Sequence, residues 1–436
     1  MNLITQPNSL RSWVLTEKLF NMQKFGLIGK TLKHSFSKKI HPFFADYPYD
    51  LIEVQPENLE SFMKDNDYDG FNVTIPYKKD VMNFLDYVDE GAKKIGAVNT
   101  VVRRNGKLYG YNTDFDGMVY ALKSAGITLE NKAVLILGSG GTSNTAQAVA
   151  ESLGACSVRK LSRTGEINYQ NYHVLASDAE IIINTTPVGM YPDNYTCLID
   201  LRCFAKLSGV LDVVYNPELT MLLKQAKDLG VPYVNGLPML VTQAKVASEL
   251  FLDKKHSDQL IDYVISKLKA ENENVVLVGM PGCGKSTIGR AVAQKLQKEF
   301  VDTDQLIEQR ENKSIPQIFA EDGEEYFRKV ESEVLRDVGK LSGKVISTGG
   351  GVVKNSDNYF QLKQNGVIIW VDRNIELLSC ENRPLSKDLD AVKKLYEERK
   401  DKYAFFADEK VSNNGLLDDA VKEIIKVYEN FSYKRT

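Results

Sequence analysis

Two glycine-rich segments of this 436-residue chain have the residue types and spacing that bind phosphate groups. One of them, GMPGCGKST at residues 279–287, follows the apolar run NVVLV, precedes the helical pattern IGRAVAQKL and matches GxxxxGK[ST] in full. Backbone amides of such a loop wrap the phosphates of a nucleotide, Lys285 reaches the β- and γ-phosphates, and the Ser286 hydroxyl binds Mg²⁺. The predicted nucleotide-binding residues of this loop are Gly279, Gly282, Gly284, Lys285, Ser286 and Thr287.

Two aspartates follow this loop in the next apolar run, FVDTD. Asp302 and Asp304 are two residues apart, so on an extended strand both side chains point to the same side. One of them can hold Mg²⁺ through water, and the other can accept a proton from a hydroxyl group. Because the segment from residue 275 onward has no HRD or DFG motif of a protein kinase, we expect the acceptor to be a small molecule.

The other glycine-rich segment, KAVLILGSGGTSNTAQAVAESLG, has the pattern of a strand, a tight turn and a helix. Gly138, Gly140 and Gly141 allow backbone N–H groups to approach a pyrophosphate at the start of the helix, although Ser143 replaces the third glycine of the usual fingerprint. Because a strand and a helix flank the turn, we expect a dinucleotide to bind here.

The end of the following strand, SVRKLSRT, indicates which dinucleotide binds. Domains that bind NAD place Asp or Glu there, on the ribose 2′-hydroxyl, whereas this chain has Ser162, Arg163 and Thr164. A guanidinium and two hydroxyls suit a 2′-phosphate, which a carboxylate would repel. NADP(H) is therefore expected rather than NAD(H), with a solvated surface arginine as the alternative interpretation of Arg163.

Composition argues against several classes of function. The 55 Lys and Arg against 58 Asp and Glu give a net charge of −3, so there is no basic field for nucleic acid. Five cysteines without CxxC pairing and four scattered histidines disfavour a disulfide framework and a zinc site, and they favour the reducing cytoplasm. No apolar run reaches the ~18 residues of a membrane span. The first 23 residues lack a signal-peptide core and are interpreted as an extension, with Met22 as an alternative start.

Short apolar, β-branched runs alternate with amphipathic helical patterns, which is typical of an α/β fold with parallel sheets. Each glycine turn is expected to begin its own nucleotide-binding sheet. Helical periodicity from Met239 to about Leu268 is expected to end the first half. The predicted parts are an extension at 1–23, a first α/β domain at 24–112 and 236–269, a Rossmann domain at 113–235, a short linker at 270–274 and a phosphate-loop domain at 275–436.

Residues 24–268 resemble shikimate dehydrogenase. The motifs that carry the resemblance are IGKTLKHSFS, GFNVTIPYK, GAVNTVV, GYNTDFDG, the glycine turn, NTTPVGM, DVVYNP and NGLPMLVTQ, in this order. The resemblance implies that residues 24–112 and 236–269 bind the substrate and that the Rossmann domain binds NADP(H). Gly236, in the last of these motifs, is among the cofactor-binding residues that it implies.

Roles for the polar residues of this half come from the resemblance. Lys78 and Asp114 correspond to the catalytic pair, in which an ammonium beside a carboxylate hydrogen-bonds the C3 oxygen and exchanges its proton during hydride transfer. Taken alone, Lys78 beside Lys79 would be interpreted as part of a solvated face, and Ser35 and Ser37 as helix caps. The implied substrate-binding residues are Ser35, Ser37, Thr74, Asn99, Tyr215 and Gln243. The departures from the family pattern are Lys38, Pro42 and Asn144, of which Asn144 removes one phosphate contact.

Residues 274–432 resemble shikimate kinase through GMPGCGKST, DTD, FRKVE, STGGG, a short RPL segment and LYEERKDKYAFFAD. The resemblance assigns Asp304 to the acceptor hydroxyl and Asp302 to Mg²⁺, and it makes Arg383 the arginine of a short lid over the phosphates. Asp401 stands where the family often has proline. The implied residues for the substrate carboxylate and its pocket are Arg328, Gly349, Gly350, Gly351 and Arg399.

Together the two halves predict a bifunctional enzyme that uses NADPH to reduce 3-dehydroshikimate to shikimate and MgATP to phosphorylate the same C3 oxygen. The expected partners are small-molecule substrates, without nucleic acid or membrane. One alternative is an NAD-using, quinate-type dehydrogenase fused to another small-molecule kinase, and Arg163 argues against it. Another is a non-catalytic nucleotide-binding scaffold, which the presence of Lys78, Asp114, Lys285 and Asp304 disfavours. Free diffusion of the intermediate between the two sites is the expectation.

Overall fold

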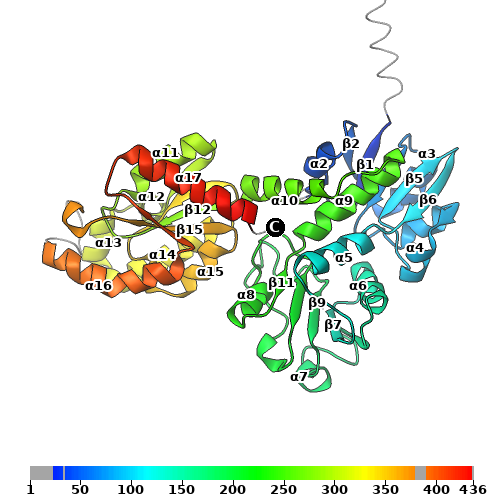
Figure 1. The fold of residues 1–436 in the computed structure, drawn as a ribbon, viewed down its shortest axis with the longest axis horizontal. Helices are drawn as coiled ribbons and strands as arrows, with labels where there is room; N and C mark the ends of the chain where they lie inside the picture. Colours follow the sequence, from blue (N-terminus) through cyan, green and yellow to red (C-terminus); the bar gives the residue numbers. More distant parts are fainter. Residues whose placement is uncertain (1–22, 33–34, 379–388, 435–436) are drawn as a thin grey trace, which may run out of the picture. The chain divides into compact units, whose positions relative to one another are not determined.

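In the residues that the structure describes, three β-sheets with helices packed beside them confirm the predicted α/β class (Figure 1). This computed structural model describes residues 23–32, 35–378 and 389–434. By their contacts these residues form two compact units. The first unit holds the residues up to Thr186, Leu201–Val213 and Gly230–Val264, and the second holds Pro187–Asp200, Val214–Leu229 and the residues from Ile265 onward. The units divide the predicted Rossmann segment between them, and the predicted domain bounds stay a prediction.

The first sheet of the first unit is mixed and six-stranded, in the order β2-β1-β3-β5-β6-β4. β1 is parallel to β2 and β3, whereas β5 is antiparallel to β3 and β6. The hairpin predicted at RNGK joins β5 to β6, with Asn105 at φ 51° and Gly106 at φ 77° in the turn. The strands are β1 Phe25–Gly29, β2 Tyr49–Glu53, β3 Gly70–Val73, β4 Tyr87–Val88, β5 Thr100–Arg104 and β6 Lys107–Tyr111. The helices of this part are α2 Ser37–Ile40, α3 Leu59–Asp65 and α4 Glu90–Ile95, with 3₁₀ turns at His41–Phe43, Pro56–Asn58 and Asp80–Phe84.

The second sheet of the first unit is parallel and five-stranded, in the order β11-β10-β9-β7-β8. Its strand β7 is the fully buried run AVLIL, which fits a strand with both faces covered. The strands are β7 Ala133–Leu137, β8 Ser157–Leu161, β9 Ile181–Asn184, β10 Gly209–Asp212 and β11 Tyr233–Val234. The associated helices are α5 Asp114–Ser124, α6 Gly141–Ser152, α7 Tyr172–Leu175 and the 3₁₀ turn Leu201–Cys203. α5 lies beside α9, Leu237–Leu252 (Figure 1).

The single helix predicted from Met239 to about Leu268 is wrong. Two helices occur there, α9 and α10, the latter at Gln259–Asn272. α9 ends because Asp253 has left-handed backbone angles, φ 50° and ψ 41°, and its N–H donates to the Glu249 carbonyl. α10 continues to Asn272, so the segment predicted as a short linker at 270–274 is helical over most of its length. None of the described helices is long and apolar enough to cross a membrane.

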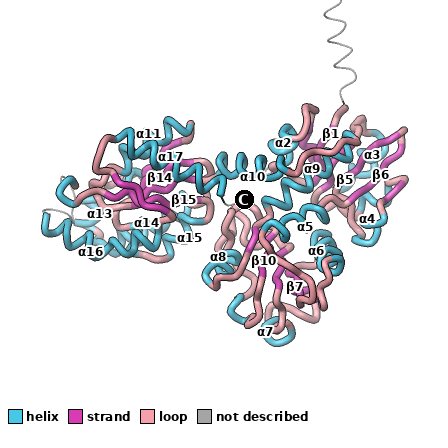
Figure 2. Tube along the Cα trace, in the orientation of Figure 1, coloured by secondary structure: helices cyan, strands magenta, loops and turns pink. Residues whose placement is uncertain are grey.

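The sheet of the second unit is parallel and five-stranded, in the order β13-β14-β12-β15-β16, and helices surround it (Figure 2). Its core includes the fully buried runs of β12 and most of β15. The strands are β12 Asn274–Val278, β13 Glu299–Asp302, β14 Lys344–Ser347, β15 Gly366–Asp372 and β16 Glu409–Ser412. The helices are α11 Lys285–Leu296, α12 Thr303–Glu311, α13 Ile315–Glu321, α14 Gly323–Val338, α15 Asp357–Lys363, α16 Leu389–Phe406 and α17 Leu417–Lys434, with 3₁₀ turns at Val352–Lys354 and Ile375–Leu377.

Residues 187–200 and 214–229, which include α8 at Met221–Asp228, belong to the second unit through specific hydrogen bonds. The Asn365 amide donates to the Tyr191 hydroxyl at 2.9 Å and accepts from the Glu218 N–H at 2.9 Å. The Leu219 N–H donates to the Gln364 carbonyl at 3.0 Å. These bonds join residues more than 130 positions apart, and no pattern in the sequence indicated them.

Candidate active sites

The candidate active site of the first unit contains an ion pair between Lys78 and Asp114. Lys78 Nζ lies 2.5 Å from Asp114 Oδ2, and the two side chains are only 16% and 9% exposed. Lys78 follows β3, and Asp114 is the first residue of α5. The sequence prediction paired these two residues, and the fold brings them together across 36 positions. An ammonium that is largely shielded from water acts more strongly on a nearby carbonyl than an exposed one does.

Asn99 holds the start of α5 in place. Its Oδ1 accepts the Thr113 N–H at 2.7 Å, and its Nδ2 donates to Thr113 Oγ1 at 3.1 Å. The Val98 N–H donates to the Lys78 carbonyl at 2.7 Å, so the same segment also fixes the backbone of the lysine. Asn99 was predicted to bind substrate, and in the structure it positions the helix that carries Asp114.

The other predicted substrate-binding residues of the first unit either follow strands that end at one edge of the first sheet or lie on α9. β1 and β3 are parallel neighbours, so Ser35 and Ser37 after β1 and Thr74 after β3 follow strand ends on one edge. Ser35 Oγ accepts the Ser37 N–H at 3.2 Å, and no side chain caps α2 at its N-cap residue. Gln243 is buried on α9, where its Nε2 donates to the Leu240 carbonyl at 2.8 Å.

The glycine turn of the Rossmann sheet lies beside the ion pair. A methyl group placed on Gly141 would lie 4.0 Å from Lys78 Cβ and 3.9 Å from Ala97 Cβ. Gly138 and Gly140 precede it in the turn between β7 and α6. A dinucleotide whose pyrophosphate occupies this turn therefore binds next to Lys78.

The residues predicted to select NADP(H) lie after β8. Ser162 is half-buried, and Arg163 and Thr164 are exposed. Lys160, which sequence reasoning missed, donates from Nζ to Asn144 Oδ1 on α6 at 3.0 Å. Burial, and then the nearby charge of Lys79, lower the pKa of Lys160. Lys160 therefore lies beside Asn144, the residue that stands where the family commonly has arginine. In the sequence, Lys160 could have been recognised as a cation two positions before the SRT motif.

Gly236 and Tyr215 complete the predicted residues of the dehydrogenase half. Gly236 is the N-cap of α9, and a Cβ there would lie 2.0 Å from the Val213 carbonyl oxygen, so only glycine fits. Tyr215 belongs to the second unit, where burial raises the pKa of its hydroxyl. Its role toward substrate stays a prediction.

The phosphate loop of the second unit has the predicted strand-loop-helix order between β12 and α11. Lys285 Nζ donates to the carbonyls of Gly279 at 2.9 Å and Met280 at 3.0 Å, and Thr287 is exposed on the first turn of α11. The Ser286 hydroxyl donates to Asp302 Oδ2 at 2.7 Å. This hydroxyl and carboxylate are the oxygen ligands that Mg²⁺ prefers, beside phosphate oxygens and water. Among the described residues, no group of three His, Cys, Asp or Glu side chains could hold a metal by itself.

The two aspartates of FVDTD were predicted to lie on one strand, and this prediction is wrong. β13 ends at Asp302, which caps α12 by accepting the Asp304 N–H at 3.1 Å, and Asp304 is in the first turn of that helix. The prediction failed because an aspartate that follows a strand is also a favourable N-cap. Burial, and then the Asp302 charge, raise the pKa of Asp304 to about 6, although Lys285 opposes the shift. Asp304 can therefore exchange a proton near neutral pH.

The predicted carboxylate-binding residues meet around the STGGG loop. Arg328 Nη1 pairs with Glu331 at 2.7 Å, and a Cβ on Gly351 would lie 2.2 Å from the same nitrogen. A Cβ on Gly349 would lie 2.7 Å from Asp304 Oδ1.

Arg399 has the donors that a carboxylate needs. It is only 2% exposed and donates to the Gly350 carbonyl at 3.0 Å, whereas its Nε and Nη2 have no hydrogen-bond partner within the described part of the chain. Two buried, unsatisfied guanidinium donors are suited to a bidentate carboxylate. Arg383, the predicted lid arginine, lies outside the described residues.

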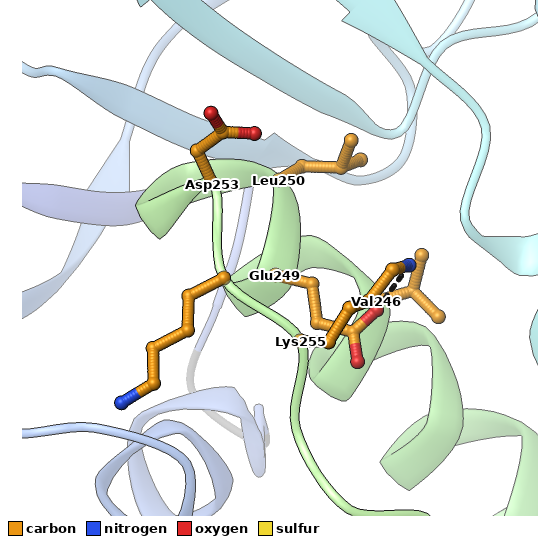
Figure 3. Close-up of a pocket in the computed structure, with 6 residues that line it drawn as sticks. Val246, Glu249, Leu250, Asp253 and Lys255 are labelled. Carbon is orange, nitrogen blue, oxygen red and sulfur yellow. Dashed lines mark hydrogen bonds and ion pairs between the residues drawn. The ribbon is translucent and has the colours of Figure 1, made fainter.

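A small pocket at the end of α9 is separate from these residues (Figure 3). It is lined by Val246, Glu249, Leu250, Asp253, Lys254 and Lys255. Glu249 pairs there with Lys255 at 2.8 Å and with Lys245 at 2.7 Å, so its carboxylate is already satisfied. None of the predicted catalytic or binding residues lines this pocket.

The folds and sites define a chain with two nucleotide-binding parts, one Rossmann-like and one with a phosphate loop, and comparisons with known proteins identify both. Residues 27–101 match the family model "Shikimate dehydrogenase substrate binding domain", and residues 281–429 match "Shikimate kinase". The chain is 40% identical over 259 residues to a shikimate dehydrogenase (NADP(+)) of Methanococcus maripaludis, a match that covers 53% of this chain and 91% of that protein. The chain belongs to the shikimate dehydrogenase family and also carries a shikimate kinase domain.

Two solved structures resemble the dehydrogenase part. One is a chorismate mutase/shikimate 5-dehydrogenase fusion protein from Clostridium acetobutylicum, at 34% identity and TM-score 0.54, covering 57% of this chain and 98% of that one. The other is shikimate 5-dehydrogenase from Thermus thermophilus in complex with NADP(H) and shikimate, at 29% identity and TM-score 0.51, covering 56% of this chain and 98% of that one.

Proposed function

We propose that this chain is a bifunctional enzyme of the shikimate pathway. It reduces 3-dehydroshikimate to shikimate with NADPH and then phosphorylates the same C3 oxygen with MgATP. The observation that carries the proposal is that each nucleotide-binding turn lies next to a group suited to proton transfer, Lys78 in one unit and Asp304 in the other. We also propose the reducing cytoplasm as the location, because the five cysteines of the sequence lack CxxC pairing.

In the first reaction Lys78 acts on the ketone oxygen. Its ammonium has three donors, and Asp114 accepts one of them at 2.5 Å, which leaves the others for the substrate. NADPH supplies the hydride to C3. Lys78 stabilises the negative charge that develops on the oxygen and supplies the proton that completes the hydroxyl group. Ser35, Ser37 and Thr74 are proposed to bind the carboxylate, and Asn99, Asp114 and Gln243 the ring hydroxyls.

In the second reaction Asp304 acts on the new hydroxyl group. Its carboxylate accepts the C3 hydroxyl proton while the oxygen attacks the γ-phosphorus, and MgATP supplies the phosphoryl group. Arg399, with two unsatisfied donors, and Arg328 are proposed to grip the carboxylate and so orient the ring. Lys285 leaves the loop carbonyls to bind phosphate oxygens.

One reaction mixture tests both steps. Purified full-length protein with 3-dehydroshikimate, NADPH and MgATP is expected to consume NADPH and release ADP, and ADP release should require NADPH. Lys78→Ala should lower NADPH consumption by about 100-fold or more and leave ADP release from added shikimate intact. Lys285→Ala should do the reverse, so each variant is the control for the other.

The results that would contradict the proposal are specific to each half. If the unchanged protein consumes no NADPH, the reductase assignment is wrong. If it releases no ADP from shikimate, the kinase assignment is wrong. If Lys78→Ala and Lys285→Ala each remove both activities, the two sites are not the separate sites proposed here.

A further inference from the structure

Arg373 lies at the edge of the kinase sheet where the phosphate loop begins. It is the first residue after β15, and β15 pairs in parallel with β12, whose carboxyl end leads into the loop. Because the carboxyl ends of neighbouring parallel strands meet at one edge, residues that follow them share the site at that edge. No motif in the sequence pointed to Arg373.

The Arg373 guanidinium lies against the last residues of the phosphate loop. A methyl group placed on Gly284 would lie 4.0 Å from Arg373 Nη1 and 2.7 Å from Asn413 Nδ2. Asn413, which follows β16, donates from Nδ2 to the Cys283 carbonyl at 2.7 Å and so holds this part of the loop. Arg373 and Asn413 therefore approach the loop together, immediately before Lys285.

No acidic side chain of the described residues neutralises Arg373. Its Nε is buried and has no hydrogen-bond partner. The adjacent carboxylate, Asp372, pairs instead with Lys410 at 2.8 Å. Arg328 in the same unit is by contrast held by both Glu331 and Glu324.

An unpaired cation at this place is unfavourable in the free protein. Lys285 is the residue after Gly284, and the N-terminus of the 12-residue helix α11 adds partial positive charge. Positive groups held together without an anion repel one another, and a multiply charged anion removes that repulsion. The anion that the proposed kinase reaction brings to this loop is the polyphosphate of ATP.

We infer that Arg373 is a further nucleotide-binding residue, whose guanidinium binds the polyphosphate of ATP in the phosphate loop. The inference rests on the proposed kinase function. The planar fork of donors in arginine fits phosphate oxygens, and Nε, which has no partner among the residues that the structure describes, is one of those donors. Arg373 thus adds a second cation to the one that Lys285 supplies.

The test uses the full-length protein with Arg373→Gln, which keeps a polar side chain that can donate a hydrogen bond and removes the charge. We expect KM for ATP to rise about tenfold, because a charge-assisted hydrogen bond to phosphate is lost. KM for shikimate and the rate of NADPH consumption should not change. Arg373→Lys should recover part of the affinity, and inorganic tripolyphosphate should inhibit the Gln variant more weakly than the unchanged protein.

Arg290→Gln is the matched control. Arg290 lies on α11 in the same unit, is exposed and stacks on Phe300 at 4.5 Å, so its loss should leave both KM values unchanged. An unchanged KM for ATP in Arg373→Gln would overturn the inference. The inference would also be overturned if Arg373→Gln bound ADP more weakly but tripolyphosphate inhibited it as strongly as the unchanged protein. Arg373 would then contact the nucleoside and not the polyphosphate. Direct titration with ADP measures binding without turnover, so failure of the kinase proposal is seen separately, as a protein that binds ADP and does not phosphorylate shikimate.

Discussion

Asp302 and Asp304 have the same side chain, and their different surroundings suit them to the different roles proposed for them. Asp302 accepts hydrogen bonds from the Ser286 hydroxyl and the Asp304 N–H, which hold its carboxylate at the end of β13. Asp304 is buried next to that negative charge, and burial and the charge together raise its pKa to about 6. A carboxylate held beside a hydroxyl is suited to a metal ion, and one that titrates near neutrality is suited to a proton.

The raised pKa of Asp304 predicts the pH dependence of the kinase reaction. Only the deprotonated carboxylate can accept the hydroxyl proton, so kcat/KM for shikimate should be constant above about pH 7 and fall below about pH 6. Below that pH the decrease should approach about tenfold per pH unit. Initial rates of ADP release from about pH 5 to pH 8 provide the measurement.

Asp304→Asn is the control for this profile. The amide cannot accept the proton, so the rate should fall by about 100-fold or more and lose the step near pH 6. NADPH consumption by the same variant should match that of the unchanged protein. A kinase rate that stays constant across the acidic range in the unchanged protein would contradict the role of Asp304.

Sequence motifs predicted candidate catalytic side chains and could not describe their surroundings. Lys78 and Asp114 were paired from the order of motifs, and the fold places them 2.5 Å apart. The burial of Asp304, the contact between Lys160 and Asn144, and the approach of Arg373 to Gly284 were not foreseen. Each of these depends on side chains from different elements, and spacing along the chain does not contain that information.

At the scale of elements, patterns predicted the strands well and the helix boundaries less well. The buried runs at β7, β9 and β12 are mostly apolar, so they were recognised directly. The break between α9 and α10 was missed because helical periodicity resumes beyond Asp253. A single residue in left-handed conformation ends a helix without changing the apolar pattern on either side.

The loop after β14 predicts a substitution that affects one substrate. In Gly351→Ala the new Cβ would lie 2.2 Å from Arg328 Nη1, so the guanidinium must move. The guanidinium is the end of a flexible side chain, so the fold can accommodate the shift. The guanidinium then no longer has its position toward the substrate carboxylate. We expect KM for shikimate in the kinase reaction to rise about tenfold and KM for ATP to stay nearly unchanged.

Gly415→Ala is the comparison for this loop variant. It adds the same methyl group in the same unit, at a glycine that has no heavy atom within 4 Å of the new Cβ. Both KM values should stay as in the unchanged protein. Equal effects of the two substitutions would show that Gly351→Ala acts through general stability and not through Arg328.

At the scale of the whole molecule, the two parts are not simply joined end to end. The sequence indicated two halves and a linker, whereas the compact second unit also includes residues 187–200 and 214–229. Glu218, from the second of these segments, meets Lys269 at 3.5 Å, and its negative charge contributes to the raised pKa of Glu273. Long-range contacts of this kind follow from the complementarity of packed surfaces, which no local pattern records.

Glu273 is a buried carboxyl group that neither proposed reaction uses. It is 3% exposed, and the Ser432 hydroxyl donates to its Oε2 at 2.7 Å. Burial, and then the negative charge of Glu218, raise the pKa of Glu273 to about 8. Lys298 Nζ donates to the Glu273 carbonyl at 3.1 Å, and burial lowers the pKa of that lysine to about 8, so the ammonium is the prevailing form below this pH.

This cluster predicts that stability falls as pH rises. The pKa of Glu273 is higher in the folded protein than in the unfolded chain, so between about pH 5 and pH 8 the folded state binds more protons. The contribution of Glu273 to the free energy of unfolding is therefore present near pH 5 and lost as the pH rises through about 8. The side chain in Glu273→Gln is uncharged at every pH and can still form hydrogen bonds. Near pH 8 this substitution should raise the midpoint of thermal unfolding by roughly 2–4 °C, which corresponds to about 1 kcal/mol.

Thermal unfolding of the unchanged protein, Glu273→Gln and Glu271→Gln from about pH 5 to pH 8 separates this effect from other titrating groups. Glu271 is exposed and two residues away, so its variant should follow the unchanged protein at every pH. The difference between Glu273→Gln and the unchanged protein should grow with pH, because only the unchanged protein must either bury a charge or keep a proton there. A difference that is constant with pH would mean that Glu273 is ionised throughout, and the contact with Glu218 would then be a repulsion that the fold tolerates.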